Sequence, residues 1–164
     1  MKLTKLTALL LLTGFTFSIS SCESDAELKR VSEYAKTGIT LSGAQETPAN
    51  TSAALGTLDV FYTRASKVLT YTINWSGLSG PVTAAHIHGL APTGYLAGVV
   101  QTFNLANITR CATVSTTTCG TYKGSLLVDE VVVKENDLIN GVYYVNLHTA
   151  AFPAGEIRAQ IKFQ

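Results

Sequence analysis

The chain has 164 residues, of which 12 are Lys or Arg and 11 are Asp or Glu, for a formal net charge of +1. Its basic residues form no block, which excludes the usual electrostatic basis of nucleic-acid binding. Only three histidines occur, His86, His88 and His148, so any imidazole chemistry is confined to two short segments.

Residues 1–21 have the pattern of a signal peptide. Lys2 and Lys5 precede an apolar stretch, Leu6–Phe17, that is shorter than the roughly 20 apolar residues of a membrane-spanning helix. The next four residues, Ile19-Ser20-Ser21-Cys22, resemble the lipobox of bacterial lipoproteins. An ordinary secretory peptide followed by a chance cysteine is the alternative.

The lipobox resemblance implies cleavage before Cys22 and acylation of that cysteine. The protein would then be lipid-anchored to a membrane of the bacterial cell envelope, outside the cytoplasm, at the outer membrane or the cell surface. Cleavage removes two lysines and no acid, so the formal charge falls from +1 to −1. The polar residues 22–37 are predicted to be a flexible tether, and residues 38–164 to be the folded domain.

From Gly38 onward, short segments of alternating polarity are separated by Gly and Pro turns, which is typical of β-strands. The predicted elements are strands around Leu58–Tyr62, Leu69–Trp75, Ala84–His88, Ala97–Phe103, Val142–His148 and Glu156–Phe163, a Leu- and Val-rich segment Ser125–Val133, and a helical turn Lys134–Ile139. This order predicts an all-β domain, an antiparallel β-sandwich or barrel that is immunoglobulin-like or superoxide-dismutase-like.

Cys111 and Cys119 flank a polar, Thr-rich segment. An even pair of cysteines outside the cytoplasm favours a disulfide. A two-cysteine metal site is the alternative, but neither cysteine has a histidine nearby in sequence.

Strand alternation also sorts the polar residues. If the strands that hold the histidines are neighbours, one non-core face gathers their side chains together with polar ones from the last strand. That set is His86, His88, Asn146, His148, Glu156 and Arg158. Trp75 and Tyr71, by contrast, share the alternation of Leu69 and Ile73 and are predicted to be core residues.

Several ordered motifs resemble the CHRD domain, which was named from chordin and occurs widely in bacterial secreted proteins. The motifs are Leu41–Pro48 (Leu-Ser-Gly-Ala-Gln-Glu-Thr-Pro), Gly77-Leu78, Ala85–Gly89 (Ala-His-Ile-His-Gly), Tyr144–Thr149 (Tyr-Val-Asn-Leu-His-Thr) and Pro153–Gln160 (Pro-Ala-Gly-Glu-Ile-Arg-Ala-Gln). The resemblance implies a β-sandwich-like domain. The cysteine-containing segment Arg110–Gly120 departs from the pattern. A weaker likeness to copper–zinc superoxide dismutase fails because that enzyme needs more histidines.

Two interpretations of the histidines stay open. In the first, His86, His88 and His148 bind copper or zinc, with Glu46 or Glu156 as a fourth ligand and Asn146 and Arg158 orienting the ligands. In the second, the histidines only hydrogen-bond to neighbouring groups and hold loops in place. Glu156 and Arg158 are also expected to form an ion pair.

Two classes of function follow. The first is a non-enzymatic binding module, anchored through Cys22, that contacts a protein or other envelope partner. The second is a metal-binding domain that uses the three histidines, with a redox role attached. The sequence shows no nucleophile–base pair or paired-carboxylate pattern, so no catalytic residue is predicted.

Overall fold

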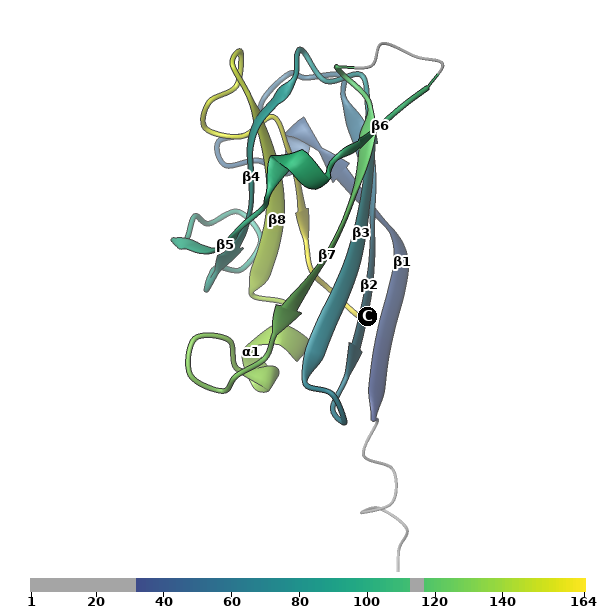
Figure 1. Ribbon diagram of the computed structural model, residues 1–164. Helices are drawn as coiled ribbons and strands as arrows, with labels where there is room; N and C mark the ends of the chain where they lie inside the picture. The colour runs from purple at the N-terminus through teal and green to yellow at the C-terminus, as the bar shows by residue number, and fades with distance from the viewer. Residues whose placement is uncertain (1–31, 113–116) are drawn as a thin grey trace, which may run out of the picture. The chain divides into compact units, whose positions relative to one another are not determined.

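The computed structural model describes residues 32–112 and 117–164. Within these residues nine strands form one antiparallel sheet, which curls so that its two halves face each other (Figure 1). The prediction of an all-β sandwich or barrel is confirmed. The predicted signal peptide and Cys22 lie outside the described residues. In the part of the chain that is described, no helix has the length and apolar character needed to cross a membrane.

The strands follow the order β5-β4-β8-β9-β1-β2-β3-β7-β6 across the sheet. They are β1 (Glu33–Ser42), β2 (Leu55–Thr63), β3 (Val68–Ser76), β4 (Val82–Gly89), β5 (Val99–Thr102), β6 (Thr109–Arg110), β7 (Gly120–Leu127), β8 (Tyr143–Thr149) and β9 (Ile157–Gln160). Two short 3-10 turns, η1 (Gly43–Gln45) and η2 (Leu105–Asn107), and one helix, α1 (Glu135–Ile139), connect them. The predicted helical turn at 134–139 matches α1.

The tether predicted over residues 22–37 ends earlier than expected, because β1 begins at Glu33. Residues 33–36 pair with β2, from Glu33 opposite Thr63 onward. Their polar composition suggested a linker, but Tyr34 packs against the core and lies 5.6 Å from the ring of Phe163. This contact, a second one with the ring of Tyr62 at 6.2 Å, and the backbone ladder hold the segment in the sheet.

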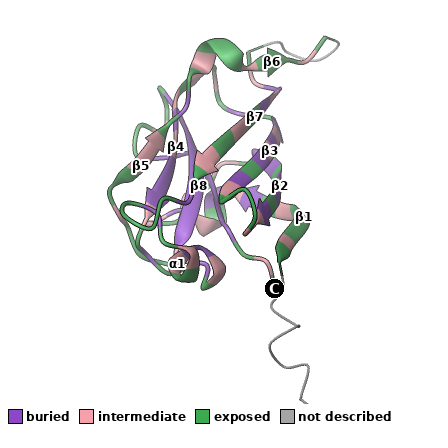
Figure 2. Cartoon of the chain, turned by 60° about the horizontal axis from the view of Figure 1, so that its bottom comes forward, coloured by how far each residue is buried: buried purple, intermediate pink, exposed green. Residues whose placement is uncertain are grey.

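The apolar core lies between the two halves of the sheet. The predicted alternation holds in β3, where Leu69, Tyr71, Ile73 and Trp75 are all at most 4% exposed. Figure 2 shows β8 buried, while β2 and β3 alternate along the strand between buried residues and more exposed ones. In β8 every residue is buried, so the strand is covered on both faces.

The predicted disulfide between Cys111 and Cys119 is confirmed. It joins the segment after β6 to the start of β7, with a sequence separation of 8. In the chain-entropy description, closing so short a loop stabilises the fold by about 2–3 kcal/mol. It therefore secures the edge of the sheet, far along the strand order from the histidines.

Candidate metal centre

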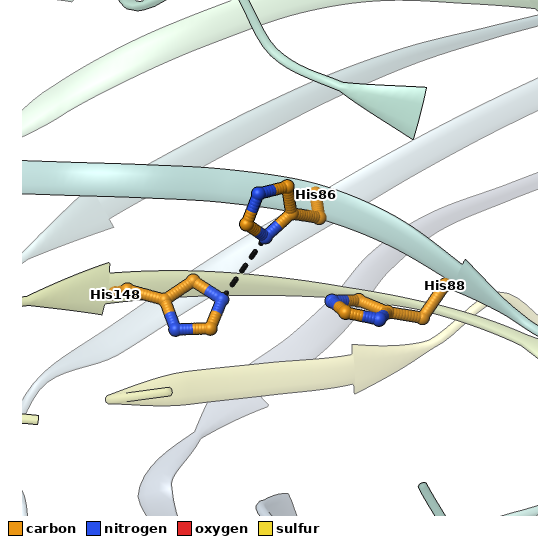
Figure 3. Close-up of side chains that lie close together, drawn as sticks. All are labelled: His86, His88 and His148. Carbon is orange, nitrogen blue, oxygen red and sulfur yellow. Dashed lines mark hydrogen bonds between the residues drawn. The ribbon is translucent and has the colours of Figure 1, made fainter. Parts of the chain in front are cut away.

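The pairing of β4 with β8 brings the three histidines together. In this antiparallel pair His86 lies opposite Asn146, and Ala84 lies opposite His148. Side chains at alternate positions of a strand share a face, so His86 and His88 project on the same side as Asn146 and His148. Figure 3 shows the three rings gathered over these two strands.

This face was predicted to be the non-core side of the sheet, but most of it is buried, and His86 is only partly exposed. His88 and His148 are each 9% exposed, Asn146 is 2% exposed and Arg158 is 1% exposed. Loops from distant parts of the chain cover it: Asn50 Nδ2 donates to the carbonyls of Gly155 and Glu156, both at 3.1 Å. The fold therefore has two interiors, an apolar core and a polar layer on the other side of β8 and β9.

The ligand nitrogens of His86, His88 and His148 all lie within 4.8 Å of one another. The closest pair is His86 Nδ1 and His148 Nε2, 3.1 Å apart (Figure 3). Around a tetrahedral zinc ion with Zn–N bonds of 2.0–2.1 Å, two nitrogens stand about 3.3 Å apart. The pair of His86 and His148 already has nearly this spacing, and ligation by all three nitrogens would require the more widely separated rings to move closer.

Backbone carbonyls determine which nitrogens are free to bind a metal. His88 Nδ1 lies 3.0 Å from the carbonyl oxygen of Ala97, and His148 Nδ1 lies 3.0 Å from that of Pro153. A carbonyl oxygen only accepts, so both Nδ1 atoms carry the proton and donate. In the neutral rings the Nε2 lone pairs are then directed into the cluster. Such a carbonyl partner for the second ring nitrogen is usual for metal-ligating histidines.

Asn146 lies at the centre of the cluster. Its Oδ1 atom is 3.1 Å from His88 Nε2 and 3.0 Å from His148 Nε2. With Nδ1 of His88 and His148 protonated, neither Nε2 atom can donate to Oδ1, so three acceptor atoms meet there. His86 Nδ1, 3.1 Å from His148 Nε2, is the ring nitrogen that can donate a hydrogen to one of them.

Burial also favours the neutral, metal-binding form of the imidazoles of His86 and His148. It lowers the pKa of His86, with further lowering from His148 and His88, and it lowers the pKa of His148. Neutral imidazole is the ligating form, so desolvation and mutual repulsion favour ligation over protonation.

Arg158 supports the cluster from β9. Its guanidinium carbon lies 3.4 Å from the centroid of the Tyr144 ring, and that ring stacks on His88 with centroids 4.8 Å apart. Arg158 also donates to the carbonyl oxygen of Tyr95 at 3.0 Å, in the loop between β4 and β5. Arg158 thus supports His88 in two ways. It holds the Tyr144 ring that stacks on His88, and it holds the loop whose Ala97 carbonyl orients His88.

Glu46 directly follows η1 and is a buried acid close to this polar layer. It is 6% exposed, and its Oε1 has no hydrogen-bond partner within the described residues. Burial raises the pKa of Glu46 to about 7, against the lowering effect of Arg158. Glu46 Oε1 and Asn146 Nδ2 both lie against Gly155, in the space that a side chain at that position would occupy. Glu46 therefore reaches the layer through Asn146, and it does not belong to the cluster of three nitrogens.

Glu156 lies elsewhere than predicted. Its carboxylate accepts hydrogen bonds of 2.6–2.8 Å from Thr149, Ser79 and Ser52. Burial opposes ionisation of this group, but these bonds outweigh it and lower its pKa. The expected ion pair with Arg158 does not form in the described structure, and the carboxylate is already satisfied where it is. Its role is to tie the loops before β2 and β4 to β8.

The loop carbonyls are the contributors that sequence reasoning missed. Strand alternation places Tyr144 on the same face as Asn146 and His148, but its stacking on His88 could not be predicted. The carbonyls of Ala97 and Pro153 leave no trace in the sequence, because every residue has a carbonyl and only the loop path brings these two to the rings.

Fold and site together define an all-β domain with a curled antiparallel sheet and a histidine-containing polar layer. The CHRD domain matches residues 37–161, and the chain belongs to this family. The expected resemblance is thereby confirmed. No curated protein and no solved structure matches the chain.

Proposed function

We propose that this CHRD protein is a lipid-anchored, non-enzymatic binding module of the bacterial envelope whose polar layer takes up one copper or zinc ion. The observation that carries the metal assignment is the group of three imidazole nitrogens within 4.8 Å, with two Nδ1 atoms held by backbone carbonyls. Three nitrogen donors with an open position suit zinc or copper. His86, His88 and His148 would be the ligands, and Asn146 and Arg158 would orient them.

The metal assignment is tested by titrating the metal-free protein, prepared without a histidine tag, with zinc and with copper. We expect one equivalent per chain. His148→Ala and His86→Ala should each weaken binding roughly 100-fold or more, since even indirect supports of metal ligands are worth 10–100-fold. Asn74→Ala, on the far side of the apolar core, is the matched control. Absence of binding at excess metal by a folded protein would contradict the assignment.

The anchor is tested separately from the metal. Support for it comes from Ile19-Ser20-Ser21-Cys22 after a basic and apolar start. We expect wild-type protein to sediment with membranes and Cys22→Ser to be released or left unprocessed, because two or more acyl chains are needed for stable anchoring. Mass spectrometry of the N-terminal peptide identifies the acyl groups. An unmodified Cys22 in the mature protein would refute the anchor.

Contact with an envelope partner is the second candidate function. The loop between β4 and β5 favours it, since Leu90, Tyr95 and Leu96 are 56%, 66% and 63% exposed. Exposed aromatic and aliphatic side chains on an ordered loop are common at protein interfaces. The same loop supplies the Ala97 carbonyl to His88, so a partner there would sense the state of the metal cluster.

A further inference from the structure

The start of β1 and the loop that follows β7, which exposes apolar side chains, lie at the same end of the sheet. Glu33 pairs with Thr63, Thr63 with Val68, and Val68 with Leu127, so four strands end in the same row. The loop that follows β7 begins here, with Val128 N donating to the carbonyl oxygen of Lys67. In Figure 1 the start of β1 and the loop before α1 both lie at the lower end of the sheet.

This loop, residues 128–134, holds two valines away from the core. Val128 and Val133 are buried and fix its two ends. Between them the Asp129 carboxylate accepts hydrogen bonds from the backbone N–H groups of Val131, Val132 and Val133 at 2.8–3.0 Å. The loop is therefore a defined turn, and it leaves Val131 79% exposed and Val132 63% exposed.

Leu127 extends the apolar surface onto the sheet, at 59% exposed. Together Leu127, Val131 and Val132 form what we term the apolar tip. Exposed lysines flank it, Lys67 on the neighbouring hairpin and Lys134 directly after the loop. Three acids lie in or beside the loop, and each has a partner within the protein. Asp129 accepts backbone N–H groups, the exposed Glu130 accepts from the N–H of Glu135 at 3.3 Å, and Glu135 forms an ion pair with Arg64 at 2.7 Å.

We propose that the apolar tip inserts into the lipid surface to which Cys22 is anchored, so that the domain is held with this end against the membrane. This inference rests on the lipid anchor proposed above. From Cys22 to Glu33 the chain can extend at most about 40 Å, so the end of the sheet where β1 starts stays within about that distance of the membrane. That position selects a lipid surface over a protein as the occupant of the tip.

Because the protein is anchored, even weak insertion of the apolar tip into the bilayer can orient the domain. A tethered group meets the bilayer at a high effective concentration, so a few aliphatic side chains suffice to bias the orientation. Valine and leucine enter the interface readily, while the stems of Lys67 and Lys134 allow their ammonium groups to reach lipid phosphates.

The test uses the full-length lipidated protein in vesicles of phosphatidylethanolamine and phosphatidylglycerol. Val131→Cys is labelled with a polarity-sensitive fluorophore, and the vesicles carry a brominated lipid as quencher. Ser76→Cys, exposed at the opposite end of β3, is the matched control. Acylation of Cys22 and the Cys111–Cys119 disulfide leave the introduced thiol as the labelling site. We expect several-fold stronger quenching at position 131 than at position 76.

A second variant checks that insertion depends on the apolar side chains. Val132→Ser, combined with the label at position 131, should weaken the quenching while leaving the melting temperature unchanged, because Val132 is exposed. Equal quenching at positions 131 and 76 in an acylated protein would overturn the apolar tip and leave the anchor standing. An unacylated Cys22 in the mass spectrum would overturn the anchor and this inference with it.

Discussion

Replacing Arg158 with methionine is expected to lower the free energy of unfolding by about 3–5 kcal/mol at pH 8, as for other buried charges that lose a partner. Arg158 is 1% exposed and makes four kinds of contact. Its guanidinium lies over Tyr144, donates to the Tyr95 carbonyl and to Thr47, and donates to Gln160 at 3.2 Å. Methionine fills a similar volume but offers none of these hydrogen bonds.

The loss of stability caused by Arg158→Met should also depend on pH. Arg158 is the positive charge that lowers the pKa of Glu46, so its removal leaves the Glu46 carboxylate buried without compensation. The destabilisation should therefore be smaller at pH 5, where Glu46 is protonated, than at pH 8. Urea unfolding at both values measures it. Lys36→Met removes a positive charge from an exposed position of β1 and should change stability by less than about 0.5 kcal/mol. A loss at Arg158 no larger than this would contradict the supporting role assigned to it.

Replacing Glu46 with glutamine is expected to stabilise the protein at pH 8 and to leave it unchanged at pH 4. In the unfolded chain the carboxyl ionises near 4.5, and in the folded protein burial raises its pKa to about 7. Because the folded pKa is the higher one, stability is greatest below 4.5 and falls as the pH rises toward 7. The difference between the two pKa values corresponds to about 3 kcal/mol of folding stability, which is lost in full above pH 7.

Glutamine does not ionise, so the variant should lack this loss and exceed the wild type by up to about 3 kcal/mol at pH 8. Denaturant unfolding from pH 4 to pH 8 gives the difference curve, in which the titration of all other groups cancels. Glu33→Gln, at an exposed position, is the control and should change stability by less than about 0.5 kcal/mol. A flat curve for Glu46→Gln would show that the folded carboxyl ionises at its ordinary pH.

The histidine-containing face illustrates what strand alternation can predict. Successive side chains of a strand point to opposite sides, so placing Asn146 and His148 together, away from Val145 and Leu147, needs no knowledge of the rest of the fold. The structure pairs β4 with β8 and brings His86 and His88 to the same side. Whether a metal binds there stays a prediction.

Burial of that face could not be predicted in the same way. A strand with alternating polarity is ordinarily half exposed, and the exposed side was expected to be open. Asn50 lies in a loop 106 residues from its partner Glu156, directly before β9. Tyr95 lies in another loop, 63 residues from its partner Arg158 in β9. No local pattern reveals that such loops fold over the sheet. The predicted ion pair between Glu156 and Arg158 was wrong for the same reason, because Ser52 and Ser79 from distant loops bind the Glu156 carboxylate.

The sequence by itself determined the all-β class, the disulfide between Cys111 and Cys119, the family and the faces of the strands. These are local properties: they follow from alternation, spacing and motif order within short segments. Only the tertiary structure decided that the polar face is an interior, that Glu46 has a raised pKa and that two backbone carbonyls orient His88 and His148. Desolvation and hydrogen-bond geometry depend on groups brought together from distant segments, and the chain acquires them only when its loops close over the sheet.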